Sequence, residues 1–521
     1  MKYIKQKFTT LTLKIGVIAA MLLTSISCDD GFEEMNIDPN AYTEPVIGNL
    51  FTFSIVRTAG TGVPDRNRVM IKHVSGLMQY MATLQTFWYG EKYIYHDQGG
   101  DFFNTAYNIH LKELQQIFPY VEDDPEKINH NAMARIWRVF ILHRVTDVYG
   151  DIPYSEAGKG FTEGIFKPKY DRQSLIYADM LKELEEAAAQ LDPGKSSFGP
   201  ADVIYGGDPT MWKTFAYSMM LRLGMRLTEV DQAMAQTWVQ KAIAGGVMQS
   251  NNDIAFLEHV DGHPNTRNQD AWELQRESFP PNLRGLAKVK VSKTLIDMLK
   301  DRNDPRLPFY VHLWDGTTDS ELQEGLPNGQ DDATISNVIP GWENNMLLGY
   351  SEPNNRTIAS MNSPTVFLSY SEVELLLAEA ALRGWHSSSP EAHYHAAITA
   401  SMEATTLYPG DVVISPAVIE GYLAAQPLTG TTQEQMEQIH TQFFLSHFMY
   451  FDFFEAWANW RRTGYPILIP VNYPGNDTGG VIPRRLRYPQ TEPALNTENY
   501  EAANQNQGPD LLLTRVWWDV D

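Results

Sequence analysis

The chain contains a single cysteine, Cys28, among its 521 residues. No disulfide can therefore form within it, and its stability has to come from a buried core. A chain of this length can bury a large one. The sequence thus favours a sizeable globular fold over a small scaffold held together by crosslinks.

Cys28 also follows a segment that has the features of a secretory signal peptide. Four lysines (Lys2, Lys5, Lys7 and Lys14) precede an uncharged stretch, residues 15–27, that ends in small residues. At 13 residues this stretch is shorter than the roughly 20 that a membrane-spanning helix needs. We predict a signal peptide over residues 1–27 and a lipid anchor on Cys28, although Ser25 stands where a lipoprotein signal usually has leucine. A buried free thiol is the alternative.

The remainder, residues 28–521, is predicted to be one domain, with residues 28–45 as a flexible acidic tether. The whole chain has 41 basic and 64 acidic residues, a net charge of −23. This sign disfavours a nucleic-acid partner, whose phosphates require a basic surface. Aromatic residues make up 12% of the chain, including 12 Trp and 25 Tyr. Such an excess is typical of surfaces that bind carbohydrate or peptide as well as of cores.

Apolar residues recur at spacings of three and four along much of the chain, which predicts a mainly α fold. We expect helices over residues 131–149, 177–191, 209–227 and 433–462, and one that opens with a capping box at Ser371. Long segments rich in Gly, Pro and Asn separate them: 90–100, 259–281, 314–355 and 470–492. The prediction is a scaffold of tetratricopeptide-like helical hairpins with a large irregular, loop-rich face and few short strands, although no strict 34-residue repeat is visible.

No recognised catalytic motif occurs in the sequence. It has no H-E-x-x-H and no C-x-x-C for zinc, and no glycine-rich nucleotide loop in the required context. We therefore expect no catalysis, no cofactor and no metal, although a carboxylate pair for glycoside hydrolysis could exist among 64 acids. His393 and His395 would face opposite sides of a helix or the same side of a strand, and we expect them to be a solvent-exposed pair.

Several short motifs, weak singly but ordered along nearly the whole chain, together resemble one family. They are F-E-E-M-N-I-D-P-N at 32–40, T-D-V-Y-G-D-I-P-Y at 146–154, Y-G-G-D at 205–208 before Trp212, N-D-P-R at 303–306, S-Y-S-E-V at 369–373, R-R-T-G-Y-P at 461–466, P-R-R-L at 483–486 and V-W-W-D at 516–519. The chain resembles the SusD/RagB-type (SusD-like) outer-membrane lipoproteins of Bacteroidetes. The resemblance implies a tetratricopeptide-like scaffold that lies as a lid over a SusC-type TonB-dependent transporter and passes it nutrients, commonly glycans. The acidic residues after Cys28 resemble the signal that sends such lipoproteins to the cell surface.

The motifs themselves read mainly as scaffold. Arg461 and Arg462 stand at the end of a predicted helix, where they can bond its last carbonyls, and we expect them to pair with acids such as Glu455. The ligand site is therefore to be sought in the loops.

The densest group of loop aromatics lies between Thr86 and Asp97 and supplies the first candidate ligand-binding residues: Trp88, Tyr89, Tyr93, Tyr95 and Asp97. Sugar rings stack on Trp and Tyr while polar side chains bond the hydroxyls, and a peptide would use the same groups. Burial of these aromatics beneath the loop is the alternative. Trp272 with Arg276, and Trp314, lie in later loops and are further candidates.

From the sequence we expect a surface-exposed lipoprotein on the outer membrane that binds an oligosaccharide and delivers it to the transporter. The alternatives are a peptide-binding member of the same family and a surface-anchored glycan hydrolase.

Overall fold

The computed structural model describes residues 45–61 and 68–520. The predicted signal peptide, Cys28 and most of the tether lie outside these residues. Residues 47–521 form one compact unit. No helix in the described ranges is both long and apolar enough to cross a bilayer.

Helices dominate the fold, as predicted, and the strands are few and short. The α-helices are α3 (Ile47–Thr58), α5 (Ser75–Leu77), α6 (Asp101–Thr105), α7 (Lys112–Gln115), α8 (Ile128–Tyr149), α9 (Gly160–Glu163), α10 (Gln173–Gln190), α11 (Pro209–Arg226), α12 (Gln232–Gly245), α13 (Gln269–Ser278), α14 (Lys293–Asp301), α15 (Leu307–Tyr310), α16 (Ile335–Val338), α17 (Tyr370–Leu382), α18 (Pro390–Glu403), α19 (Pro416–Ala425), α20 (Thr432–Tyr450), α21 (Phe453–Thr463), α22 (Glu492–Leu495) and α23 (Thr497–Gln507). The strands are β1 (Met81–Thr83), β2 (Ile152–Pro153), β3 (Tyr170–Asp171), β4 (Ala255–Leu257), β5 (Val289–Val291), β6 (Val311–His312), β7 (Glu352–Pro353) and β8 (Thr365–Leu368).

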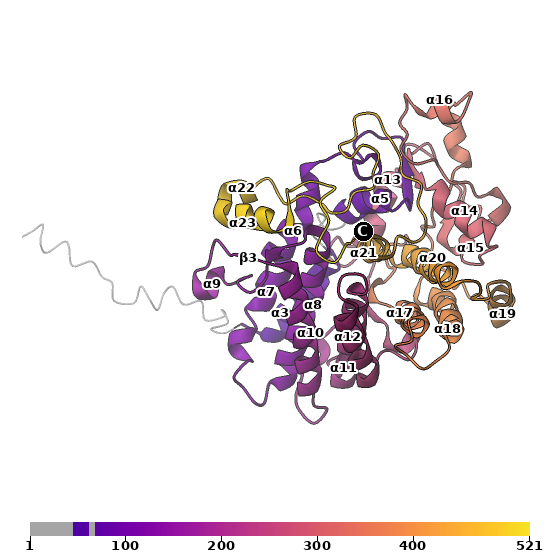
Figure 1. The fold of residues 1–521 in the computed structure, drawn as a ribbon. Coiled ribbons are helices and arrows are strands. Elements are labelled where there is room, and N and C mark those ends of the chain that lie inside the picture. Colours follow the sequence, from indigo (N-terminus) through magenta and orange to yellow (C-terminus); the bar gives the residue numbers. More distant parts are fainter. Residues whose placement is uncertain (1–44, 62–67, 521) are drawn as a thin grey trace, which may run out of the picture. The chain divides into compact units, whose positions relative to one another are not determined.

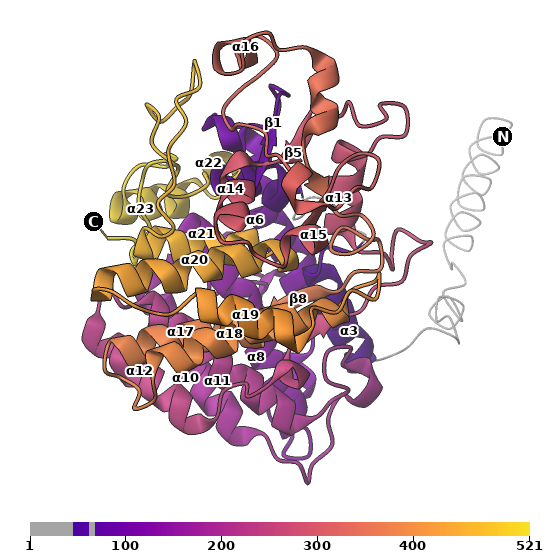
Figure 2. The same ribbon diagram turned by 90° about the vertical axis from the view of Figure 1, so that its right-hand side faces the viewer.

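The long helices pack against their neighbours in sequence, as helical hairpins do. Helix α10 contacts α8 and α11, α11 contacts α12, and α17 contacts both α18 and α20. Helix α11 also contacts α17, which joins the first set of hairpins to the second. Figure 2 shows α10–α12, α17–α19 and α20 stacked in successive layers. This arrangement confirms the predicted helical-hairpin scaffold.

Local sequence explains where these helices begin. The Asp208 side chain accepts hydrogen bonds from Thr210 and Met211 N–H, and Pro209 occupies the first turn of α11. The helix predicted to open at Ser371 is instead capped by Ser369, whose hydroxyl accepts from Glu372 N–H, because α17 begins at Tyr370.

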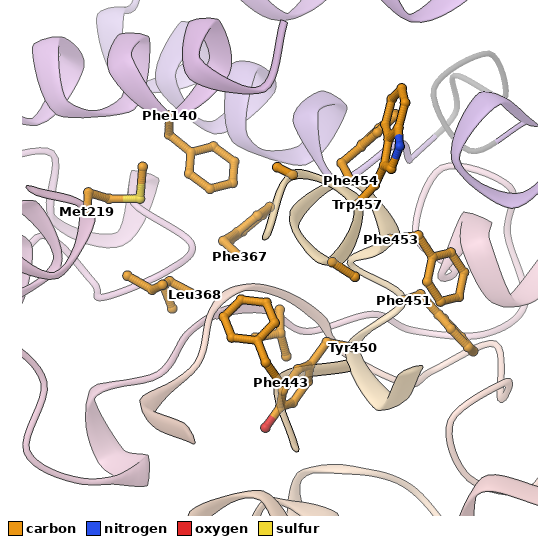
Figure 3. Packing of buried hydrophobic residues seen from close by; sticks show 14 of the residues in the cluster. Phe140, Met219, Phe367, Leu368, Phe443, Tyr450, Phe451, Phe453, Phe454 and Trp457 are labelled. Carbon is orange, nitrogen blue, oxygen red and sulfur yellow. The ribbon is translucent and has the colours of Figure 1, made fainter. Parts of the chain in front are cut away.

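The single helix predicted over 433–462 is wrong. The chain forms α20 and α21 instead, separated by Phe451 in the left-handed conformation (φ 50°) and by Asp452, which caps α21. Buried aromatics from both helices line the core there. Figure 3 shows Phe443 of α20 and Phe453 and Phe454 of α21 among the buried residues of this region. Phe367 of β8 belongs to the same core, and its ring centroid lies 5.4 Å from that of Phe140 of α8.

Four two-stranded antiparallel sheets support the loop-rich face. Strand β1 pairs with β5, with Met81 opposite Val291 and Thr83 opposite Val289. Strand β5 also lies against β7, since Val291 N–H donates to Ser351 O at 2.8 Å. Helix α13 packs on β5, β7 and the π-helix η1 (Met70–Val74). The segment 259–281, expected to be a loop, thus contains the helix α13 (Figure 1).

Buried ion pairs hold the helical layers to one another. Arg222 Nε of α11 lies 2.6 Å from Glu372 Oε1 of α17, and Arg462 Nη2 of α21 lies 2.6 Å from Glu379 Oε2, also of α17. Arg462 therefore pairs with an acid, as expected, but not with Glu455. Arg461 forms no ion pair with a carboxylate of the described residues. Its guanidinium donates to Arg484 O at 2.9 Å and lies 3.9 Å from the Trp457 ring centroid.

His393 and His395 both lie on α18 and are half-buried. His393 Nδ1 lies 2.6 Å from Glu374 Oε2 of α17, and His395 Nε2 lies 3.1 Å from Gln426 O. They are therefore not the solvent-exposed pair expected from the sequence.

Candidate ligand-binding surface

The aromatic segment between Thr86 and Asp97 directs its side chains to different parts of the molecule. Trp88 and Tyr93 point into the core and are 0% and 1% exposed. The Tyr93 hydroxyl accepts a hydrogen bond from Val471 N–H at 3.3 Å, and its carbonyl accepts one from Asp477 N–H at 2.9 Å. The burial alternative therefore holds for these two residues, and neither can stack on a ligand in this conformation.

Tyr95 and Asp97 contact a C-terminal segment, whereas Tyr89 packs within its own loop. The Tyr89 ring stacks on His96 at 4.1 Å, and the Arg487 guanidinium lies 4.1 Å from the Tyr95 ring centroid. The Asp97 carboxylate accepts from Gln490 N–H at 3.2 Å. Tyr95 and Asp97 thus hold residues 487–490 against the loop, and the cavity lined by Tyr89 and Tyr95 is only about 10 Å³. They do not meet the other candidates.

Phe87 was not among the candidates predicted from the sequence, but it is the aromatic residue of this loop that is linked to α13. It is 47% exposed, and the Lys72 ammonium of η1 lies 5.8 Å from its ring centroid. Lys72 Nζ in turn lies 3.2 Å from Glu273 and 2.9 Å from Glu277, both on α13. Lys72 thus connects the exposed ring to the helix. Phe87 lies in a turn directly before Trp88, and no local pattern in the sequence indicates which of the two rings is exposed.

Trp272, on the same helix, lies between two arginines. The guanidinium carbons of Arg267 and Arg276 lie 4.5 Å and 5.1 Å from its ring centroid. Arg276 also donates to Glu273 at 2.5 Å and to Glu277 at 2.9 Å. The predicted pair Trp272 and Arg276 is therefore in contact, and its side chains combine an aromatic ring with charged hydrogen-bonding groups.

Trp314 extends this face beyond the end of α13. It is 47% exposed and follows β6, whose His312 ring lies 5.4 Å from Phe279 at the C-terminal cap of α13. Gly285 (φ 82°) packs beneath it, where a Cβ atom would come within 2.4 Å of Trp314 Cβ. Only glycine permits so close an approach. We call Lys72, Phe87, Trp272, Arg276 and Trp314 the α13 surface.

A hollowed region lies apart from the α13 surface, between α7, α8, α10 and the β2–β3 hairpin. It consists of two adjoining grooves of about 790 Å³ and 920 Å³, which share Gln115 and Gly158 as lining residues. Its walls include Tyr154, with the Arg138 guanidinium 4.8 Å from its ring centroid, and Phe166, which is 81% exposed. From the sequence we interpreted residues 146–154 as scaffold. These grooves were not predicted, because their walls come from segments far apart in the chain.

One cluster of side chains in the described residues has the composition of a metal site. Ligand atoms of His143, Asp147 and Glu455 lie within 4.8 Å of one another, all buried. Arginines occupy this cluster, however: Arg226 and Arg144 donate to Glu455. Burial alone would raise the pKa of Glu455, but these arginines and Arg222 outweigh it and hold the pKa well below its usual range. The guanidinium groups supply the positive charge that a metal would bring, so the residues do not fit an ion.

The chain matches a family model described as starch-binding and associating with the outer membrane, the SusD-like family, over residues 39–489. A search of curated proteins found no match.

Solved structures are also similar to the chain. A chitin-binding protein is 31% identical, with a TM-score of 0.79 and coverage of 91% of this chain and 100% of the other. A SusD-like protein of Bacteroidetes AC2a is 25% identical, with a TM-score of 0.79 and the same coverage. A chitin-binding SusD homologue from Flavobacterium johnsoniae is 25% identical, with a TM-score of 0.75 and coverage of 91% and 99%. With the family model matched over most of its length, the chain belongs to the SusD-like family of nutrient-binding proteins that associate with the outer membrane.

Proposed function

We propose that the protein binds an uncharged oligosaccharide on the α13 surface and delivers it to a TonB-dependent outer-membrane transporter of the SusC type. The observation that carries this proposal is the grouping of exposed Phe87 and partly exposed Trp272 with the ionised side chains of Lys72 and Arg276. Aromatic faces take the CH faces of sugar rings, and the charged groups bond hydroxyls. The expected lipid anchor on Cys28 would hold the protein at the membrane surface.

The charge of the chain supports an uncharged ligand. The net charge of −23 over the whole chain disfavours anionic glycans such as uronic-acid polymers, and at the site itself Glu273 and Glu277 are paired with Lys72 and Arg276. Two of the similar solved structures are of proteins described as chitin-binding. Chitin oligosaccharides are uncharged, and their acetamido groups add an N–H donor for a carboxylate and a methyl group for an aromatic ring. They are the first ligands to test.

We further propose that the protein binds without cleaving. Glycoside hydrolysis uses two carboxyl groups, one of which must carry a proton. At the α13 surface both Glu273 and Glu277 accept hydrogen bonds from Arg276, and both lie within 3.2 Å of the Lys72 ammonium. Neither is left free to act as the acid, which supports a binding role over the hydrolase alternative.

Isothermal titration of the purified protein with chitohexaose, maltoheptaose and a neutral peptide tests this proposal. We expect chitohexaose to bind, and Trp272→Ala to weaken binding about tenfold, because a stacking contact contributes about 1 kcal/mol or more. Phe166→Ala is the matched control, since it removes an exposed ring from the other groove. Equal binding by Trp272→Ala, with loss in Phe166→Ala, would move the site to the grooves. Release of shorter sugars during incubation would contradict the non-catalytic role.

A further inference from the structure

Arg267 is held in place directly before helix α13. The Val260 N–H group donates to Thr266 O at 2.9 Å and closes the loop ahead of it. The next residue, Asn268, caps α13, since its side chain accepts from Ala271 N–H. Hydrogen bonds on both sides therefore fix the backbone of Arg267 relative to α13.

The two arginines that lie against Trp272 differ in their partners. Arg276 forms ion pairs with Glu273 at 2.5 Å and with Glu277 at 2.9 Å. Arg267, whose guanidinium lies 4.5 Å from the Trp272 ring centroid, forms no ion pair with a carboxylate of the described residues. Arg267 therefore brings to the ring a positive charge that no ion pair in this part of the structure compensates.

The hydrogen-bonding groups of Arg267 are also unused. Its Nε atom is buried and has no hydrogen-bond acceptor within residues 45–61 and 68–520. Its Nη groups are not among the buried atoms, and they have no acceptor in these residues either. Burial lowers the pKa of Arg267 and the charge of Asp261 opposes this effect, but a guanidinium remains protonated. Arg267 can thus offer the N–H donors of both Nη groups to an oxygen atom of a ligand.

The charges around Arg267 decide which oxygen it binds. A carboxylate and an amide carbonyl can both accept hydrogen bonds from a guanidinium. Asp261 is exposed and its charge acts on Arg267, while the whole chain carries a net charge of −23. Both disfavour an anionic group at this position. A neutral carbonyl meets no such repulsion and is therefore the favoured acceptor.

An acetamido group supplies such a carbonyl together with a methyl group. Oligosaccharides of chitin and of cellulose share one backbone linkage, but chitin has an acetamido group where cellulose has a hydroxyl. An acetamido oxygen bound to Arg267 brings the methyl group next to Trp272, because the guanidinium lies against that ring. A site that bonds one group of a ligand discriminates against an analogue that lacks this group.

We propose, on the basis of the function given above, that Arg267 is a specificity-determining residue of the α13 surface and donates to the acetamido oxygen of an N-acetylated sugar. The substrate class is then oligosaccharides of N-acetylated sugars, selected over glucans of the same linkage. Lys72 and Arg276 bond hydroxyl groups that both kinds of ligand carry. They contribute affinity without selecting between the two.

Titration calorimetry of the purified protein with chitohexaose and cellohexaose tests this selection. The parent should bind chitohexaose at least about ten times more tightly than cellohexaose. Arg267→Gln should lose about tenfold or more in affinity for chitohexaose and less than about twofold for cellohexaose, because it removes one hydrogen bond from a charged donor. Arg276→Gln is the matched control, since it should weaken the binding of both ligands by the same factor and leave their ratio unchanged.

Unchanged selectivity in Arg267→Gln would overturn the proposal while leaving oligosaccharide binding intact, whereas a parent that binds neither sugar would refute the function as well. Tighter binding of hexagalacturonate than of chitohexaose by the parent would show that the acceptor is a carboxylate and would also overturn it. A crystal structure of the parent with chitotriose gives a check that does not depend on any variant folding. An acetamido oxygen within hydrogen-bonding distance of Arg267 supports the proposal, and a sugar bound without this contact refutes it.

Discussion

Phe87 and Trp88 are adjacent in the chain, but we expect Phe87 to contribute to ligand binding and Trp88 to stability. Replacing each in turn therefore distinguishes an effect on binding from an effect on the free energy of unfolding. Trp88 is fully buried and packs in the main core, whereas Phe87 is 47% exposed beside Lys72. Truncating a buried Trp to Ala costs about 3–5 kcal/mol, because its transfer free energy is lost and a cavity remains. Trp88→Ala should therefore destabilise the protein by about this amount.

The expected change in melting temperature follows from the size of the unit. An unfolding entropy of about 2.1 cal/mol/K per residue, over the residues 47–521 that form the unit, gives about 1 kcal/mol/K. A loss of about 3–5 kcal/mol then lowers Tm by about 3–5 °C. The Trp88 indole N–H has no partner among the described side chains and backbone. Trp88→Phe keeps much of the ring volume and removes this buried donor, so it should cost clearly less than Trp88→Ala.

Differential scanning calorimetry and ligand titration on the same samples decide the matter. Phe87→Ala should leave Tm within about 1 °C of the parent, as surface substitutions usually do, and should weaken oligosaccharide binding. Trp88→Ala should instead lower Tm and leave oligosaccharide binding close to that of the parent. If Trp88→Ala has the Tm of the parent but a lower affinity for the oligosaccharide, Trp88 contacts the ligand and our assignment of the α13 surface is wrong.

Three further outcomes are expected. Cys28→Ala should release the protein from membranes and abolish acyl labelling; retention of the unlabelled variant would exclude a lipid anchor on this residue. Tagged protein solubilised in mild detergent should bring down a large TonB-dependent barrel, through an interface above about 2,000 Å²; recovery of the protein alone under conditions that preserve comparable complexes counts against the transporter partner. Burial raises the pKa of Glu379, but Arg462 and His440 outweigh it, so the pKa lies well below its usual value. A carboxyl with a lowered pKa stabilises the fold at neutral pH and loses this contribution as pH falls. Glu379→Gln should therefore cost about 3–5 kcal/mol at pH 7, and urea unfolding should show the gap from the parent narrowing below pH 4.5; a constant gap would contradict the lowered pKa.

The helical scaffold was largely readable from the sequence because its signals are local. Asp208 and Pro209 mark the start of α11, and Gly150 marks the end of α8. The break between α20 and α21 was not readable. Phe451 adopts a left-handed conformation that glycine usually takes, and the apolar pattern continues through it. Here tertiary packing of aromatic side chains overrides a local preference.

The site was only partly predictable, for a different reason. Trp272 and Arg276 were predicted as an aromatic and a charged residue within an expected loop, and the helix that brings them together was not predicted. The connection to Phe87 runs through Lys72, about 200 positions away from Trp272 in the chain. Long-range pairing of β1 with β5 brings these segments together, and no local pattern encodes it. Which of two adjacent aromatics is exposed follows from this pairing. The aromatic composition of the loop indicated a ligand-binding segment, but it did not indicate which of the aromatic side chains are exposed.

Buried ion pairs fix both the helical layers and the strands beneath the α13 surface. Arg222 with Glu372 and Arg462 with Glu379 are desolvated, so each requires its partner, and removing either member of a pair leaves an uncompensated charge inside the fold. Such pairs penalise any shift of α11, α17 and α21 against one another. The strands β5 and β7 are held in the same way, since the buried Lys290 of β5 pairs with the buried Glu352 of β7. Phe87 and Trp314 at the α13 surface are half-exposed and belong to none of these ion pairs. Substitutions of these two residues can therefore change ligand contacts without removing a charge that a buried partner requires.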